Sequence, residues 1–306
     1  MSAVKGLFIE VVRLGGLSTK ELTRRVMSEI WDDKCFARAA QLAYYFLFAL
    51  FPFLLFLTTL LGYLPVADPM ETVMGFLTRF VSHDVLRLIR DNIQDLVTQQ
   101  RGGLLSVGIL MALWLATSAV VAVGDVLNEA YGVIEARPLW KIYGEALLLM
   151  IGLTFLFVFS TVLLIFGPQL GAIVGNAMNL GKAFEIAWNI LRWPVILFFV
   201  NLAVAMLYYF TPDVEQKWKW VTPGAIFALA GWLIVSLGFA YYVNSFDSYN
   251  KTYGSIGTVI VLLTWLYLTG LFILIGGEIN SEIEHATRNG KAFGEKNYLN
   301  NNKVYL

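Results

Sequence analysis

Long apolar stretches separated by short polar segments dominate the pattern along this chain. The last of them, residues 256–277, contains no charged side chain, and Glu278 follows it directly. A helix needs about 20 apolar residues to cross the hydrocarbon core of a bilayer. We therefore predict transmembrane helices near residues 40–64, 103–124, 142–166, 193–211, 222–244 and 256–278.

An amphipathic helix is predicted before the first span. Ser18 and Glu21 form a capping box at its start, and Leu22, Val26 and Ile30 then share one face. Such a helix either lies on the cytoplasmic membrane surface or packs beneath the bundle, and the pattern fits both arrangements.

The segment between the first two spans has helical periodicity as well. Leu86, Ile89, Ile93 and Leu96 recur at the spacing of one helix face. We expect one or two short helices on the outer side.

Composition supports an all-α integral membrane protein with six transmembrane helices. Of the 306 residues, 58% are hydrophobic and only 14% are charged, whereas soluble domains carry about 25% charged residues. We divide the chain into an N-terminal cytoplasmic arm (1–38), a transmembrane domain (39–284) and a cytoplasmic tail (285–306).

Lysine and arginine set the predicted orientation. With the N-terminus inside, 15 of the 22 Lys and Arg residues fall in the inner segments. Positive residues are enriched on the cytoplasmic side of membrane proteins. Both termini are therefore expected to be cytoplasmic.

Small residues recur at four-residue steps in the second span. This spacing lets helix backbones approach closely in lipid. The stripe indicates packing within one chain or a face for a homo-oligomer, and it consists of Gly108, Ala112, Ala116 and Gly124.

Polar residues gather at the predicted inner ends of the helices. They could form a polar vestibule on a transport path or a rim of helix ends joined by salt bridges. This candidate inner cluster contains Arg38, Gln41, Asp125, Asn128, Glu129, Arg137, Glu145, Glu278 and Asn280.

Glu278 is the most unusual member of that cluster. Gly276 and Gly277 precede it and would let another helix come close. We predict that its carboxylate faces the bundle and pairs with a basic or amide side chain, the candidates being Arg38, Arg137 and Asn128.

A second polar segment, residues 243–257, lies on the predicted outer side. It is either a plain connection or the lining of an external mouth. The candidate mouth residues are Asp247, Tyr249, Lys251 and Tyr253.

The sequence argues against several chemistries. Cys35 is the only cysteine, and His83 and His285 are the only histidines. A single cysteine cannot form an intrachain disulfide. Two distant histidines cannot supply the two-metal site of a metal-dependent nuclease. Net charge is zero and no basic cleft is evident, so we expect no cofactor, no nucleic-acid partner and no enzymatic activity.

Four sequence blocks resemble the YihY/virulence-factor BrkB family, once labelled ribonuclease BN. The first is LAYYFLFALFPFLLFL, and the second is LWLATSAVVAVGDVLNEAYGVIEARPLW. The last two run from YYFTPDVEQKWKWVTPGAIFALAGWL to the segment ending GGEIN. The resemblance covers roughly residues 35–284. It implies a six-helix bacterial inner-membrane protein, in a family with links to envelope lipid or lipopolysaccharide export and to serum resistance.

Two functions fit these observations. The first is a transporter or flippase-like protein for an amphipathic or lipidic envelope substrate, with membrane lipids as its partners. The alternative is a non-transporting scaffold or assembly factor, which the absence of a charged group in the middle of any span favours.

Overall fold

The computed structural model describes residues 16–61, 71, 74–75, 102–245, 249–287 and 296. Within this part the chain is helical and contains no strand. Its long helices are α2 (Thr19–Asp32), α3 (Cys35–Leu61), α6 (Gly102–Ala130), α7 (Leu139–Ala177), α8 (Gly181–Phe210), α9 (Trp218–Ser245) and α10 (Tyr249–Ala286). The predicted all-α class is confirmed.

Five of these helices, α6 to α10, are long and apolar enough to cross a membrane. α3 has 27 residues and contains the first predicted span, but its side chains are described only as far as residue 50. The part of α3 with described side chains, Cys35–Leu50, is an apolar helix that is shorter than the five candidate spans. The chain is therefore a multi-pass membrane protein, and the count of six spans stays a prediction.

α10 lies at the centre of the bundle, with α2, α3, α6 and α9 packed against it. It crosses α9 where Gly276 meets Gly224, so closely that a methyl group on either glycine would overlap the other helix. Gly277 likewise accommodates Leu127 of α6. The paired glycines before Glu278 thus allow two neighbouring helices to approach α10.

The helix before the first span packs beneath the bundle. Ser18 accepts a hydrogen bond from the Glu21 amide at 3.2 Å, as the capping box predicts. Leu22, Val26 and Ile30 are buried in the main core. Of the two arrangements open to an amphipathic helix, the structure has the packed one.

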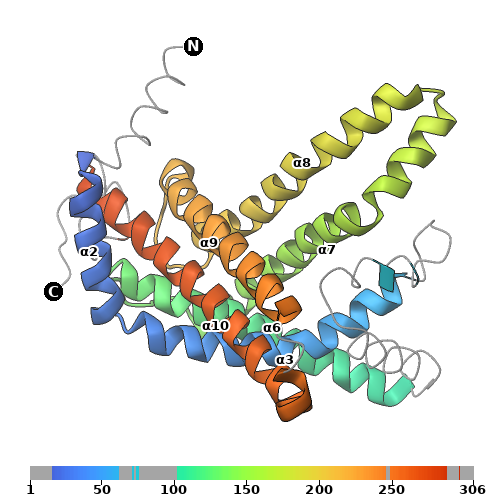
Figure 1. Ribbon diagram of the computed structural model, residues 1–306. Helices are drawn as coiled ribbons and strands as arrows, with labels where there is room; N and C mark the ends of the chain where they lie inside the picture. The colour runs from blue at the N-terminus through green and yellow to red at the C-terminus, as the bar shows by residue number, and fades with distance from the viewer. Residues whose placement is uncertain are drawn as a thin grey trace.

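α7 and α8 form a long antiparallel hairpin that leans away from the other helices (Figure 1). The prediction that the third helix ends near residue 166, before Pro168, is wrong. Pro168 lies inside α7, which continues to Ala177, and α8 begins at Gly181, well before residue 193. One proline removes one backbone hydrogen bond, and here the packing of α7 on α8 sustains the helix beyond it.

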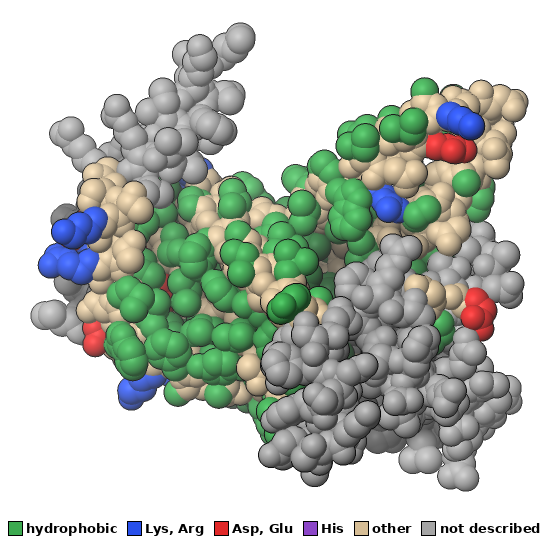
Figure 2. Space-filling model, in the orientation of Figure 1, with side chains coloured by type: hydrophobic (Ala, Val, Ile, Leu, Met, Phe, Trp, Pro, Cys, Tyr) green, Lys and Arg blue, Asp and Glu red, His purple; other side chains and the backbone are tan. Residues whose placement is uncertain are grey.

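Large apolar side chains cover the outside of the molecule (Figure 2). Leu148 and Phe155 of α7 are 72% and 69% exposed, and Leu237 of α9 is 70% exposed. Exposed apolar area on this scale would aggregate in water. It suits helices that face lipid.

Some predicted features lie outside the described residues. These include the short outer helices predicted within residues 76–101, and Asp247 of the candidate outer mouth. Tyr249, Lys251 and Tyr253 lie in the first turns of α10 rather than in a turn between helices, and their side chains are not described. The outer mouth stays a prediction.

Candidate functional site

The polar end of the bundle is the end at which α6, α8 and α10 finish and α3, α7 and α9 begin. Two short connections meet there, residues 131–138 between α6 and α7 and residues 211–217 between α8 and α9. Gly132 adopts a φ of 62°, which lets the chain reverse after α6. Pro138 then starts α7 in an extended conformation. These turns place the side chain of Arg137, which belongs to the first connection, against the second one.

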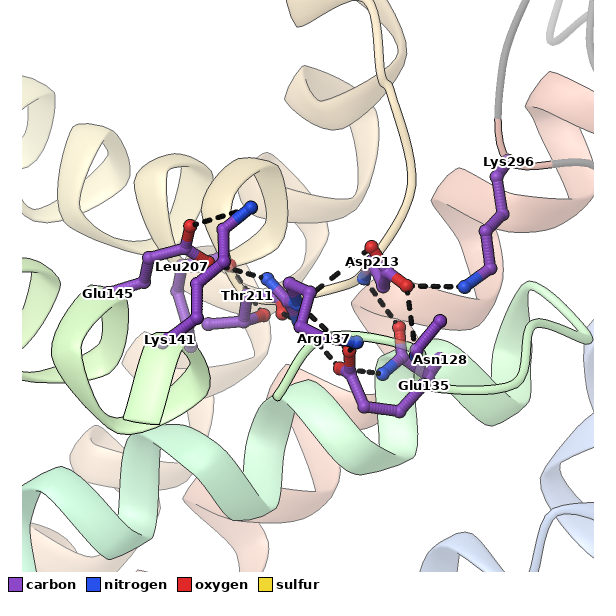
Figure 3. A network of polar contacts seen from close by, with 10 residues as sticks. Asn128, Glu135, Arg137, Lys141, Glu145, Leu207, Thr211, Asp213 and Lys296 are labelled. Atoms are coloured by element: carbon purple, nitrogen blue, oxygen red, sulfur yellow. Dashed lines mark hydrogen bonds and ion pairs between the residues drawn. The ribbon is translucent and has the colours of Figure 1, made fainter. Parts of the chain in front are cut away.

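Arg137 is the centre of a polar network (Figure 3). Its Nε donates to Glu135 Oε1 at 2.9 Å and its Nη2 to Glu135 Oε2 at 2.7 Å. Nη1 donates to Glu145 Oε2 at 2.9 Å, and Nη2 also donates to the carbonyl of Thr211 at 2.8 Å. One guanidinium therefore joins the first connection to α7 and to the end of α8.

Asn128 of α6 extends this network. Its Nδ2 donates to Glu135 Oε2 at 2.9 Å, and its Oδ1 accepts from the Asp213 amide at 2.7 Å. The Asp213 carboxylate in turn accepts from the Ala136 amide at 3.2 Å and pairs with Lys296. Three helices and both connections are thereby tied together.

The network keeps the Glu135 carboxylate ionised. Burial raises the pKa of Glu135, but the hydrogen bonds from Arg137 and Asn128 outweigh burial and bring the pKa to about 2. Hydrogen bonding to Glu135 also raises the pKa of Arg137. At neutral pH this pair remains charged on both sides.

A groove of about 950 Å³ opens beside the network, between the start of α7 and the end of α8. Part of its lining, which we call the wall, is apolar and aromatic, and the part that carries charges of both signs we call the floor. The wall contains Leu148, Leu149, Met206, Tyr209 and Phe210, and the floor contains Arg137, Lys141, Glu145, Asp213, Glu215 and Lys296.

Glu278 of α10 lies in a separate polar group. It is 1% exposed and faces the bundle, but its hydrogen-bond partner is neither basic nor an amide. Cys35, the first residue of α3, donates its thiol to Glu278 Oε1 at 3.6 Å. Arg38 instead pairs with Glu129 at 2.8 Å, and Arg137 and Asn128 belong to the network described above. The expected partners of Glu278 are therefore wrong.

The remaining members of the predicted inner cluster are dispersed. Asn280 accepts the Gly224 amide at 2.7 Å, which fixes the crossing of α9 on α10. Asp125 lines a small cavity of about 20 Å³ next to Arg137. Gln41 is exposed. The structure thus brings Asn128, Arg137 and Glu145 together, pairs Arg38 with Glu129, and leaves Glu278 and Asn280 on α10.

Sequence reasoning missed Glu135, Thr211, Asp213 and Lys296. Three of these lie in the polar connections flanked by Pro138 and Pro212, which is the signal that could have singled them out. Within the described residues there is no group of three His, Cys, Asp or Glu side chains that could hold a metal ion.

Comparisons with known proteins agree on one family. The profile described as "Virulence factor BrkB" matches residues 26–298. A "Putative ribonuclease-like protein YfkH" from Bacillus subtilis (strain 168) is 36% identical over 80% of this chain and 88% of its own length.

Two further relatives carry names that state only a membrane location. A "UPF0761 membrane protein" from Aeromonas salmonicida (strain A449) is 25% identical over 83% of this chain and 85% of its own. "UPF0761 membrane protein Smlt0865" from Stenotrophomonas maltophilia (strain K279a) is 27% identical over 82% of this chain, and this chain spans only 58% of that relative's length. No solved structure matches.

Proposed function

This chain belongs to the Virulence factor BrkB family, and we propose that it is a transporter or flippase-like protein for an amphipathic or lipidic molecule of the bacterial envelope. It would reside in the inner membrane with both termini in the cytoplasm, as its lysine and arginine distribution suggests. The polar end of the bundle would then face the cytoplasm.

The groove between α7 and α8 is the observation that carries this proposal. An amphipathic molecule needs an apolar surface for its chains and polar groups for its head. The groove supplies both side by side, with Leu148 and Tyr209 on the wall and Lys141 and Glu145 on the floor. Lys141 and Glu145 are 48% and 44% exposed and lie 3.8 Å apart, so a polar headgroup can reach both.

The network behind the groove would act as a rigid floor. Arg137 is only 13% exposed and contacts Glu135, Glu145 and the backbone at Thr211. A floor fixed in this way holds the groove charges in position without reorganisation when the substrate binds.

Lipid scrambling tests this function. The purified protein would be reconstituted in liposomes that contain a fluorescent phospholipid, and transfer between leaflets would be followed by quenching of the outer leaflet. Leu148→Trp places a bulky ring in the groove and should slow transfer several-fold. Leu237→Trp is the matched control, because Leu237 is equally exposed but lies on α9, away from the groove. No transfer of any lipid by the wild-type protein, or equal loss in both variants, would refute the groove mechanism.

The far part of the α7–α8 hairpin favours the second candidate, a non-transporting scaffold. α7 has 39 residues, or about 58 Å at ~1.5 Å per residue, against a hydrocarbon core of about 30 Å. Between residues 168 and 191 the only charged side chains are Lys182 and Glu185. Ile173, Met178, Ile186 and Ile190 are at least half exposed there. An apolar hairpin that outreaches the bilayer suits contact with another membrane or envelope protein.

Crosslinking in intact cells separates the two candidates. A photoreactive residue at position 178 would report what lies against the hairpin tip. Adducts with one defined protein, combined with no lipid transfer in liposomes, would support the scaffold. Adducts with lipid alone would count against it.

A further inference from the structure

Two carboxyl groups from separate parts of the chain meet beneath α2. Asp33 lies in the turn between α2 and α3, outside the spanning helices, and Glu278 lies near the end of α10. The Cys35 thiol, two residues after Asp33, lies 3.6 Å from the Glu278 carboxylate, and the Asp33 and Glu278 carboxyl groups act on each other at short range. Lys34, at φ 53°, makes the turn that brings Asp33 to this position.

Each of the two carboxyl groups has one buried oxygen that lacks a donor. Asp33 Oδ2 and Glu278 Oε2 are both buried and receive no hydrogen bond when both groups are ionised. Glu278 is 1% exposed, so bulk water does not reach its carboxylate. A buried acceptor without a donor is costly, and a buried unpaired charge is more so.

One proton resolves both defects at once. A protonated carboxyl donates to its neighbouring carboxylate, which removes one negative charge and creates one hydrogen bond. We propose that Asp33 and Glu278 form a proton-binding site in which a single shared proton ties the α2–α3 turn to α10. This site is distinct from the groove, and its existence does not depend on the proposed transport.

The charges around the site favour proton binding. Glu129 of α6 and Glu29 and Asp32 of α2 are acidic, and each raises the pKa of Asp33. Burial, followed by Glu129 and Glu29, raises the pKa of Asp33 to about 6.

Of the cations near the site that the structure describes, two have other partners and the third is exposed. Arg38 pairs with Glu129 at 2.8 Å, and Arg25 pairs with Glu21 at 3.0 Å and Glu282 at 3.7 Å. Lys34, next to Asp33, is exposed. The Cys35 thiol is a third titratable group in contact with the site, and it donates to Glu278.

Loss of the proton would open this part of the molecule. Two adjacent carboxylates repel each other, so α2 and its turn would separate from α10. Cys35 is completely buried at this contact, and it is the only cysteine in the chain. Its accessibility therefore reports the opening without any engineered label site.

The test measures the rate at which a maleimide probe labels Cys35 between pH 4 and 8, in detergent-solubilised native protein and in the denatured protein. Both rates increase about tenfold per pH unit because the thiolate is the reactive form, so their ratio isolates the opening. We expect the native-to-denatured ratio of the wild-type protein to rise between about pH 4 and pH 6, the ordinary and the raised pKa of Asp33, by up to roughly tenfold per pH unit for a one-proton linkage, and to level off above pH 6. Asp33→Asn and Glu278→Gln replace the shared proton by an amide donor and should hold the ratio low and constant.

Asp32→Asn is the matched control, since it makes the same change on an exposed neighbour and should keep the wild-type slope. A flat wild-type ratio, or a wild-type slope in Asp33→Asn, overturns the proposal. A ratio that responds to Na⁺ at fixed pH rather than to pH assigns the site to a metal cation and overturns it as well. If both site variants aggregate on gel filtration, the pH dependence of the wild-type thermal midpoint tests the proposal instead. It must fall between about pH 4 and 6, because a group whose pKa is raised by folding stabilises most below its unfolded pKa, and a midpoint that stays constant or rises over this range is the contrary result.

Discussion

Arg137→Ala should destabilise the protein more than any other single change in the polar network. The substitution removes a bidentate bond to Glu135, a bond to Glu145 and a bond to the Thr211 carbonyl. Glu135 is 23% exposed and would keep only the Asn128 amide and the backbone amide of residue 137 as donors. Its charge would be half-buried and unbalanced.

The magnitude follows from the geometry. A hydrogen bond to a charged group contributes about 1.5–3 kcal/mol when it is shielded from water, and an exposed ion pair contributes at most about 1 kcal/mol. The Glu135 pair is largely shielded, whereas Glu145 is 44% exposed. We therefore expect a loss of about 2–4 kcal/mol, or a fall in the thermal midpoint of roughly 3–6 °C for a chain of this size.

Thermal unfolding in detergent micelles, followed by tryptophan fluorescence, measures this effect. The informative comparison is the double variant Arg137→Ala with Glu135→Gln, which removes the unbalanced charge together with the arginine. It should recover a clear part of the loss, because the penalty lies in the uncompensated carboxylate. Arg137→Lys should recover less, since an ammonium cannot reproduce the bidentate contact. Equal midpoints for the single and double variants would refute this account.

Four further changes have distinct expected results. Gly276→Ala should lower the thermal midpoint strongly, because its methyl group would overlap the α9 backbone. Gly238→Ala is the control, since its methyl group would enter open space and should be neutral or slightly stabilising. Similar midpoints for the two variants would contradict the close crossing of α9 and α10. Asn280→Ala should cost about 1–3 kcal/mol in unfolding measurements by leaving a buried amide of α9 without an acceptor, and a loss below 0.5 kcal/mol, on the order of a surface change, would argue against that bond. Ser18→Ala should reduce the stability of α2 by about 1 kcal/mol through loss of its cap, with Ser18→Asp as the control that keeps it. In the wild-type protein the stability due to Glu135, whose pKa is lowered to about 2 from 4.5, should be complete above pH 4.5 and lost as the pH falls toward 2; a pH titration of the midpoint should show a smaller acid loss in Glu135→Gln.

The spans could be predicted from the sequence because lipid imposes a simple requirement on it. An apolar run of sufficient length must be helical in a bilayer, where every backbone group needs a partner within the helix. Residues 222–244 and 256–278 were placed on this basis, and they lie inside α9 and α10. The extent of α7 was not predicted, because the effect of Pro168 depends on packing against α8 that no local pattern reveals.

The candidate site was predictable in position but not in its partners. The predicted spans place Arg137, Asn128 and Glu278 at the inner ends of their helices, and in the structure all three lie at the polar end of the bundle. Pairing depends on rotation about the helix axes and on the path of short connections, neither of which is set by periodicity. For this reason the sequence did not reveal that Arg137 binds Glu135, two residues away in the chain, or that Glu278 accepts a hydrogen bond from the Cys35 thiol.

The two polar groups at this end of the bundle differ in how they can respond to a change of state. In the Arg137 network, cations and carboxylates alternate, so separating any pair would leave a charge without its partner. The Asp33 and Glu278 site holds acidic groups with no cation between them among the described residues, and in our proposal a proton balances it. An end built in this way resists opening along α7 and α8 but yields between α2 and α10 when the proton leaves. If the chain passes an amphipathic substrate at this end, the moving element is therefore α2 with its turn, while the groove floor stays fixed.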